Sequence, residues 1–569
     1  MKKIIVLVLA VLMSLSSIMF YACGSSSGYD PSNFLTVEEA TALGNPYQIV
    51  KNPVEIRIFV PRGASNPEYS SMRMFTTLSE LTNLKFKFIE ADEDQYMNQR
   101  SLAWEDKSNL PDLFLYRNTV SELVMYSEYK ALTTFNDPNY SKSGVTIGSL
   151  IDNYMPNYKA LLNNNFGLNT TETVKNICTL SNGFMYSTAT VRTVPRDLTF
   201  KMYINEQWIK NINEDNANVL AVEGISSADD IHTIEDYINV LRAFKQYDAN
   251  RNGRNDDEIP VTAESMNYLR NFILGSYGSV SNGIEIKNDG SEFQYTPATE
   301  SYAKYLETAR IMYVESLLDN NVFSNTSTST NDKGSAGKLG SFSAAAAYVV
   351  VGDTLDEQYT TLGALTSGYY TGSPVYFSYL KVDPLGAVIP SNSTYSREVA
   401  RLLDIMYSEL GVELQTFGKE GIDWKWTDAT KSAWEKTVPS TWNKSEEEYR
   451  ATLTPNVGLG VCLFNDYEFV KKEVGSYTTK LNKLAEKYYD NLKEPIPSYI
   501  KLTSQEYDTE AKIGASLEPK IKEWERKFII GEKTVGNDWQ SFITEISGYR
   551  YSELEDIYNG ALTRYKNSK

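Results

Sequence analysis

Residues 54–117 alternate apolar, strand-like segments with amphipathic, helix-like segments, and this alternation restricts the fold more than any other feature. The expected order is strand, helix, strand, helix, strand, over residues 54–60, 70–83, 84–91, 94–106 and 112–117. Such an order predicts a parallel sheet with helices packed against it, an α/β fold. Ligands of these sheets bind beyond the carboxyl ends of the strands. Arg62, Tyr116 and Arg117 are therefore candidate ligand contacts.

A second set of elements follows in the rest of the chain. A strand is expected at 198–205 and helices at 233–247, at 397–410 and over much of the last hundred residues. Residues 323–340 are polar and rich in Gly and Ser, which predicts a surface loop. Beyond the N-terminal segment the chain has about 520 residues, too many for one hydrophobic core, so two or more lobes are expected.

The N-terminus has the pattern of a secretory signal. Lys2 and Lys3 precede an apolar run over 4–13, which is too short for a convincing permanent membrane span. Ala22 followed by Cys23 resembles a bacterial lipobox, in which the signal 1–22 is cleaved and the cysteine carries a lipid. The "CGSSSG" sequence then begins a flexible tether over residues 23–49. This predicts a protein anchored to the outer face of the cell membrane; the alternative is a cleaved signal with an unrelated cysteine.

Composition excludes several classes of function. The net charge of −18, from 55 basic and 73 acidic residues, lacks the basic footprint of a nucleic-acid-binding protein. A single histidine, His232, rules out a multi-histidine zinc site, although not a carboxylate-based glycosidase. Cys178 and Cys462 are expected to be small core residues rather than a disulfide pair.

The segment "DANRNGRNDDEIP", residues 248–260, has the spacing of a metal loop. Asp248, Asn250 and Asn252 occupy positions one, three and five, and a glycine occupies position six, as in the first half of a calcium loop. Arg254, at position seven, would contribute its backbone carbonyl. The twelfth position is isoleucine, so the loop is not a complete EF-hand. Oxygen ligands favour calcium over zinc; the alternative is a solvated Asn/Asp turn.

The order of several motifs resembles a known family. The motifs are "SNLPDLFLY", "NGFMYS" followed by "KMYINEQWI", "TIEDYINVLRAFKQYDANRNGRNDDEIP", "ARLLDIMYSELGVELQTFGKEGIDW" and "FIIGEKTVGNDWQSFITEISGYRYSELEDIYNGALTRY". Together they resemble the extracellular solute-binding lipoproteins of carbohydrate ABC importers, in the large subgroup that includes alginate-oligosaccharide binders. The resemblance extends over nearly the whole mature chain.

The resemblance implies a two-lobe, type II periplasmic-binding-protein-like fold. Each lobe would be a doubly wound sheet flanked by helices, the sugar would bind in the cleft between them, and no catalysis is implied. The chain would cross between lobes near 195–199, 377–382 and 421–426. Lobe one would contain 50–195 plus 378–422, and lobe two would contain 196–377 plus 423–569, with the calcium loop at 248–258.

The family's calcium pattern also extends the ligand set. That pattern is usually "DxNxNGxxDEIP", whereas this chain has one more residue before the isoleucine. Asp256 is carried over directly. Either Asp257 or Glu258 supplies the last ligand, with Asp257 preferred. The implied role of the ion is structural.

A sugar cleft needs flat aromatic faces and groups that bind hydroxyls. The resemblance places the "GKEG" segment beside the cleft, so Glu420 is expected to accept sugar hydroxyls and Trp424 to stack on a ring. Arg192 and Arg196 lie near the first crossing and are further candidates. Each of these residues has an ordinary alternative, Trp424 as lobe packing and the arginines as surface residues.

The predicted function is capture of an oligosaccharide by lobe closure, followed by delivery to the permease subunits of an ABC importer. Two alternatives stay open from the sequence. One is a surface glycoside hydrolase or lyase that uses two of the many carboxylates. The other is a lipoprotein that captures peptides.

Overall fold

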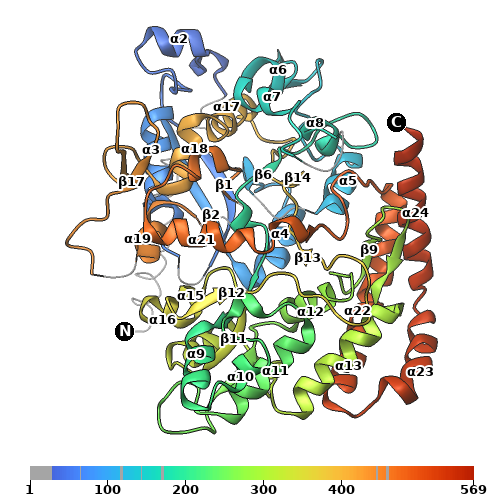
Figure 1. The fold of residues 1–569 in the computed structure, drawn as a ribbon. Helices are drawn as coiled ribbons and strands as arrows, with labels where there is room; N and C mark the ends of the chain where they lie inside the picture. Colours follow the sequence, from blue (N-terminus) through green and yellow to red (C-terminus); the bar gives the residue numbers. More distant parts are fainter. Residues whose placement is uncertain are drawn as a thin grey trace, which may run out of the picture.

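In the computed structural model the chain folds into two lobes, one above the other in Figure 1. The structure describes residues 29–63, 66–115, 119–142, 144–167, 172–443, 446–455 and 461–569. The predicted signal, Cys23, Tyr116 and Arg117 lie outside these ranges. No helix within them is long and apolar enough to cross a membrane.

The first lobe is built on the sheet that the sequence predicts. Its strands are β1 (Val54–Arg62), β2 (Leu84–Asp92), β3 (Leu113–Leu115) and β15 (Ala387–Val388), in the order β15-β3-β1-β2. Strand β1 is parallel to β2 and β3, and α3 (Arg73–Thr82) and α4 (Tyr96–Glu105) connect them. Ile58 and Val60 face one hydrophobic cluster and Phe59 faces another. The sheet is therefore covered on both faces, as predicted.

The second lobe contains a mixed sheet. Its strands are β7 (Lys201–Asn205), β8 (Ile259–Thr262), β11 (Leu339–Ala344) and β12 (Tyr359–Thr361), in the order β12-β7-β11-β8. Strand β11 is parallel to β8 but antiparallel to β7. Met202 and Ile204 face the main core, and Tyr203 faces a smaller cluster on the other side. This sheet is also packed on both faces.

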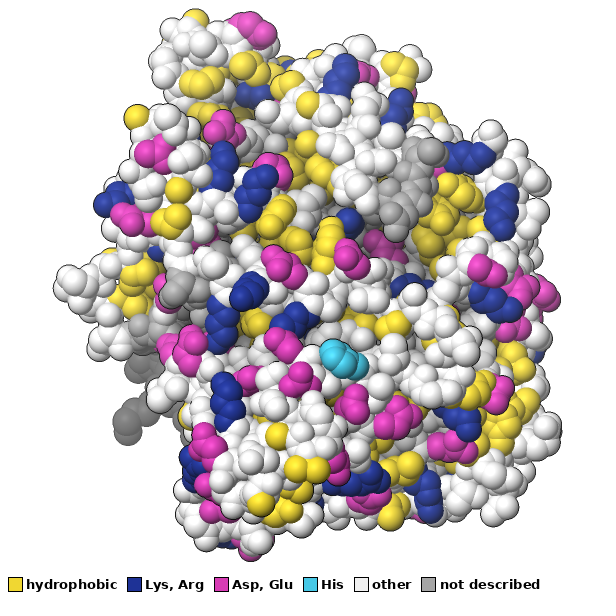
Figure 2. Space-filling model, in the orientation of Figure 1, with side chains coloured by type: hydrophobic (Ala, Val, Ile, Leu, Met, Phe, Trp, Pro, Cys, Tyr) yellow, Lys and Arg dark blue, Asp and Glu magenta, His cyan; other side chains and the backbone are white. Residues whose placement is uncertain are grey.

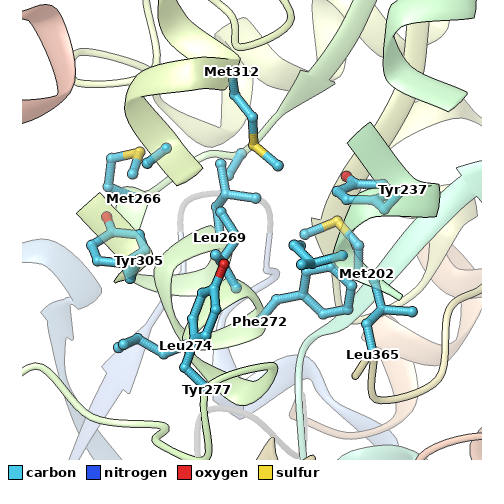
Figure 3. Packing of buried hydrophobic residues seen from close by; sticks show 14 of the residues in the cluster. Met202, Tyr237, Met266, Leu269, Phe272, Leu274, Tyr277, Tyr305, Met312 and Leu365 are labelled. Carbon is cyan, nitrogen blue, oxygen red and sulfur yellow. The ribbon is translucent and has the colours of Figure 1, made fainter. Parts of the chain in front are cut away.

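Helices supply most of the core of the second lobe. They include α9 (Glu206–Asp215), α11 (Ile234–Gln246), α12 (Met266–Gly275), α13 (Glu300–Val314), α22 (Ser504–Ile530), α23 (Val535–Ser547) and α24 (Tyr551–Asn567). Figure 3 shows Tyr237 of α11 near Phe272 of α12, with ring centroids 5.7 Å apart in an edge-on arrangement. Helix α24 runs along one side of the molecule in Figure 1. Ser504, at the start of α22, donates a hydrogen bond to Glu128 of the first lobe.

The Ser/Thr-rich segment expected to be a loop contains a helix instead, α14 (Ser327–Ser335). Thr326 caps this helix and accepts the N–H of Ser329 at 3.2 Å. Gly334 lies so close to α15 (Ala347–Val351) that a Cβ at this glycine would meet the Val350 carbonyl at 2.4 Å. Capping and close packing thus offset a composition that is poor in helix formers.

The first lobe extends further along the chain than expected. Helices α17 (Ser396–Met406) and α18 (Glu409–Phe417) lie in the expected part. Helix α19 (Glu446–Leu453) and strands β16 (Trp424–Trp426), β17 (Trp434–Lys436) and β18 (Phe464–Asn465) lie beyond it. Trp424, Trp434 and Phe469 share the core of the first lobe, and Trp434 stacks on Phe469 with centroids 5.0 Å apart. The expected boundary at residue 423 therefore differs from the packing, because these aromatic rings hold the segment to lobe one.

The N-terminal part of the described chain is also folded. Helix α2 (Val37–Ala42) begins with a capping box on Thr36. Phe34 and Ile49 are buried in the core of the first lobe. From residue 29 onward the segment expected to be a flexible tether packs on this lobe.

Three segments of the first lobe meet in a small sheet at the junction with the second lobe. Strand β6 (Thr190–Arg192) pairs with β14 (Val382–Asp383) on one side and with β18 on the other. Strand β6 leads into β7, and β14 follows β13 (Tyr376–Phe377), which pairs with β19 (Leu492–Lys493) of the second lobe. The third crossing, where the chain passes from the core of lobe one to that of lobe two, falls between Phe469 and Leu484. We call the β14-β6-β18 sheet the hinge sheet.

Cys178 and Cys462 are free and buried, which confirms the prediction that they are core residues. Their side chains make only weak contacts with neighbouring groups, such as the Tyr158 hydroxyl near Cys178. No described disulfide holds the lobes together.

A buried ion pair ties α12 to α22. Arg270 Nε and Nη2 lie 2.6 and 2.8 Å from the two Glu525 oxygens, and both side chains are 3% exposed. The Tyr305 hydroxyl donates a third hydrogen bond to Glu525 at 2.6 Å. We predict that Glu525→Gln lowers the unfolding free energy by about 3–5 kcal/mol, because it leaves the Arg270 charge buried without a counter-ion.

Chemical denaturation of the purified protein measures this loss. Glu523→Gln is the matched control, because Glu523 lies on the exposed side of the same helix and pairs there with Lys520 and Lys527. Replacing both partners, as Arg270→Met with Glu525→Leu, should recover most of the lost stability. A Glu525→Gln variant as stable as the unchanged protein would contradict the prediction.

Candidate ligand site between the lobes

A cavity of about 450 Å³ lies between the two lobes. The wall from lobe one consists of Gln415, Thr416, Phe417, Lys436, Glu446, Arg450, Asn465 and Val470. The wall from lobe two consists of Lys201, Ala345, Ala346, Tyr348, Val349, Asp353, Asp356, Glu357 and Leu481, and the first crossing adds Arg196 and Asp197. A volume of this size is typical of small-molecule sites.

The wall from lobe one is fixed by a turn that follows α18. Gly418 adopts a φ of +75°, in the left-handed region that favours glycine, and ends the helix. Asp423 is fully buried; its carboxylate accepts the Lys419 N–H at 2.9 Å and the Tyr449 hydroxyl at 2.9 Å. Arg73 of α3 adds an ion pair at 3.2 Å. The turn is thus anchored to α19 and to α3.

The wall from lobe two comes from β7, α15 and α16 (Asp353–Asp356). Tyr348 is half-buried and Val349 is 47% exposed, so both side chains reach the cavity from α15. Lys480 of α21 (Ser476–Glu486) lies 2.6 Å from the Asp356 carboxylate. Figure 1 shows α21 passing between α18 of lobe one and β12 of lobe two. This wall offers an aromatic face, an aliphatic side chain and charged groups.

Of the predicted ligand contacts that the structure describes, Arg196 lines the cavity. Arg192 is 7% exposed and lies 3.9 Å from Asp383 within the hinge sheet. Arg62 forms an ion pair with Glu90 at 2.9 Å near the end of β1. Neither residue is among those that line the cavity.

The aromatic platform predicted at Trp424 is not available in this structure. Trp424 is 0% exposed and packs edge-on against Trp434 and Phe469. Its indole N–H donates to the Gly418 carbonyl at 3.3 Å. Glu420 is exposed on the outside of the same turn and is not among the residues that line the cavity. The ordinary alternative, lobe packing, describes Trp424.

Sequence reasoning missed several residues of the cavity, above all Lys201. A signal was present, because Lys201 is the one charged residue in the otherwise apolar or neutral strand "KMYIN". A charge in a strand that is buried on both faces needs a polar environment, which marks a site. Tyr348, Lys436 and Arg450 carried no comparable signal, since their approach to the cavity depends on contacts distant in sequence.

The acidic loop folds around the Asp248 carboxylate. Its oxygens accept the N–H groups of Asn252 and Gly253 at 3.0 and 2.8 Å, and Gly253 has a φ of +86°. Asp256 points outward: its side chain is 71% exposed and pairs with Arg254. Asp257 accepts from the Asn252 amide at 3.1 Å and lies 3.6 Å from Lys338. These contacts give the loop a fixed shape.

Glu258 is the unusual carboxylate of this loop. It is 4% exposed, and both of its oxygens are buried without a hydrogen-bond partner. Burial raises its pKa, and the charges of Asp257 and Asp248 raise it further. A buried carboxylate of this kind needs a cation or a proton. The described residues contain no cluster of three or more His, Cys, Asp or Glu side chains placed to hold a metal, so any ion here would also need amide and carbonyl ligands.

Comparisons with known proteins agree with the resemblance seen in the sequence. No protein-family model matches the chain. The fructooligosaccharide ABC transporter substrate-binding protein FusA of Streptococcus pneumoniae serotype 4 is 28% identical over 214 residues, which is 36% of each chain. The match thus spans about a third of that relative's length.

Solved structures show the fold over most of the chain. FusA of S. pneumoniae in complex with kestose superposes with a TM-score of 0.72 at 19% identity, covering 91% of this chain and all of that one. A FusA EF-hand mutant with fructo-nystose gives 0.72 at 18% identity, over 91% and 100% of the two chains. The alginate-binding protein AlgQ2 without calcium gives 0.66 at 15% identity, over 91% and 99%. The chain therefore has the two-lobe fold of ABC-transporter solute-binding proteins.

The junction between the lobes contains a carboxylate, Glu494, whose pKa is raised. Glu494 follows β19 and accepts the N–H of Lys381, in the second crossing, at 3.1 Å. Burial raises the pKa of Glu494 to about 7, and the nearby Asp383 contributes to the rise. The folded protein therefore holds this proton more tightly than the unfolded chain, so stability falls as the pH rises from about 4.5 to about 7.

We predict that Glu494→Gln removes this loss while keeping a carbonyl that accepts the Lys381 N–H. The variant should exceed the unchanged protein in unfolding free energy at pH 8, by up to about 3 kcal/mol, and the difference should shrink at pH 5. Denaturant titrations at both pH values measure it. Glu486→Gln, at an exposed position of α21, controls for the loss of one negative charge. A difference that does not depend on pH would contradict the prediction.

Proposed function

We propose that this protein is the solute-binding component of an ABC importer and captures a carbohydrate in the cavity between its lobes. The observation that carries the proposal is the cavity itself, which both lobes line and which the first crossing borders. FusA, which has the same fold, is described in complex with the oligosaccharide kestose. Capture would not require chemistry, so the protein acts as a binder rather than as an enzyme.

Binding would work by closure. An open and a closed arrangement of the lobes exchange, and a ligand that contacts both walls favours the closed one. Lys436 and Arg450 approach the ligand from lobe one, and Tyr348 and Asp356 from lobe two. The hinge sheet permits the movement because the two cores are separate clusters. The closed form is what permease subunits would recognise.

The N-terminal expectations complete this proposal. Cleavage after residue 22 and lipidation of Cys23 would hold the protein on the outer face of the cell membrane, where a solute-binding protein meets its ligand. The alternatives, a glycan-degrading enzyme and a peptide-capturing lipoprotein, predict product formation and a response to peptides, respectively. Neither predicts saturable sugar binding without turnover.

We further propose that the acidic loop holds a structural calcium ion. Asp248, Asn250 and Asn252 would offer side-chain oxygens and Arg254 its carbonyl. Glu258 would be the closing carboxylate in place of Asp257, because its oxygens are buried and lack partners, and Asp256 would stay outside the site. The description of a FusA variant as an EF-hand mutant supports a metal loop in this fold. The ion would neutralise the loop's carboxylates and brace it against β8.

One prediction of the proposed function concerns the sugar. A panel of oligosaccharides should contain ligands that raise the melting temperature saturably, and Tyr348→Ala should weaken their binding about tenfold or more, roughly 1.4 kcal/mol, by removing an aromatic face from the cavity. Tyr129→Ala is the matched control, because Tyr129 is 72% exposed and does not line the cavity. If no sugar shifts the melting temperature, or if sugars are cleaved, the proposed function is wrong.

A separate prediction concerns the calcium site. Chelation should lower the melting temperature, and calcium at a hundred times its Kd should restore about 2.7 kcal/mol of stability. Glu258→Gln should abolish this response, whereas Asp256→Asn should keep it, because the Asp256 side chain is exposed and paired with Arg254. Loss of the response in Asp256→Asn with its retention in Glu258→Gln would contradict our choice of ligand.

A further inference from the structure

Lys201 brings a buried positive charge to the cavity. It lies on β7, inside the second sheet, and is 4% exposed. Its ammonium group donates to the Ala345 carbonyl at 2.6 Å. None of the described carboxylates forms an ion pair with it. A buried ammonium group whose partner is a neutral carbonyl keeps most of the cost of leaving water.

Arg196 brings a second charge to the same end of the cavity. It sits in a short helical turn, Pro195–Asp197, at the first crossing, and its Nη1 is buried with no hydrogen-bond partner. The adjacent Asp197 accepts the Asn465 amide at 2.7 Å and forms no ion pair with Arg196 among the described contacts. An unsatisfied buried donor is destabilising unless a ligand accepts its hydrogen bond. Arg196 is therefore available to an anion.

Lys436 pairs with Glu446 and, at 2.8 Å, with Glu473. Lys480 lies 2.6 Å from Asp356 and 3.6 Å from Glu357. Arg450 donates to the carbonyls of Thr454 and Pro455, and Asp353 is exposed. At the Arg196 end of the cavity, the two cations Arg196 and Lys201 accompany the single carboxylate of Asp197, which leaves one positive charge.

The pKa of Lys201 agrees with this arrangement. Burial lowers its pKa to about 8, with a smaller opposing effect from Asp197 and a further lowering from Arg196. An anion bound beside the two cations would raise that pKa again. The net charge of the whole chain does not oppose this, because acidic and basic side chains are interspersed on the face shown in Figure 2, and local charges decide at short range.

We infer that the cavity is selective for an acidic carbohydrate, one whose carboxylate, sulfate or phosphate group binds between Arg196 and Lys201. The inference rests on the proposed function and narrows it to a substrate class. The guanidinium group would supply paired N–H donors to two oxygens of the anion, and the ammonium group a single charge. Tyr348 lies along the same cavity and would face the neutral part of the sugar.

Calorimetry with matched ligands tests the inference. Oligogalacturonates are compared with their carboxyl-reduced, neutral counterparts, and a sulfated and a phosphorylated disaccharide identify which anion fits. Binding of the acidic form should exceed that of the neutral form at least tenfold and should weaken as salt increases. Arg196→Gln and Lys201→Met should each remove most of that preference, while Arg242→Gln, at an exposed ion pair of α11, should leave it unchanged.

Proton uptake gives a second readout that an indirect loss of packing would not produce. Because burial lowers the pKa of Lys201 to about 8, an anion that raises this pKa should draw in a fraction of a proton at pH 8, measured from titrations in buffers of different ionisation enthalpy. Lys201→Met should abolish this uptake. Equal binding of acidic and neutral sugars, with variants that behave like the unchanged protein, would overturn the inference but leave the proposed function standing. Binding of no oligosaccharide of either kind would overturn both.

Discussion

The hinge sheet is the constraint on which the rest of the structure depends. The N–H of Val191 donates to the Leu463 carbonyl and the N–H of Arg192 to the Lys381 carbonyl, each at 2.8 Å, so three distant parts of the chain are joined edge to edge. These bonds hold together the three segments of lobe one from which the chain crosses into lobe two. Arg196 and Asp197 come soon after β6, which places one end of the cavity beside the hinge sheet.

Several buried ionisable groups lie where the lobes meet, in addition to those inside each lobe, such as Arg270 with Glu525 and Asp423. Asp383 with Arg192, Glu494 near Lys381, and Lys201 in the cavity all lie along this junction. Such groups are tolerated only with a partner, a shifted pKa or a ligand. The hinge and the candidate site are thus parts of one polar region.

The sequence predicted those elements whose signals are local. The strand expected at 54–60 is β1, and the helix expected at 233–247 is α11, because Thr233 and Asp236 form a capping box at its start. Trp424 was misplaced because its environment depends on Trp434 and Phe469, which periodicity does not connect to it. The third crossing between the lobes was misplaced for the same reason. Arg196 became a candidate because the resemblance placed a crossing between lobes at 195–199, and it lies in the cavity lining.

In the acidic loop, the local sequence pattern determines the turn, and a long-range contact determines which carboxylate is buried. Spacing alone marked Asp248, Asn250 and Asn252 as candidate ligands. The resemblance left the last ligand open between Asp257, which was preferred, and Glu258, which is the buried one. The Ile259 N–H donates to the Lys338 carbonyl at 2.8 Å, which pins the end of the loop at the start of β8 and buries Glu258 just before it. Arg254 and Asp256 pair on the solvent side of the loop, whereas Glu258 is the carboxylate of this segment that faces inward.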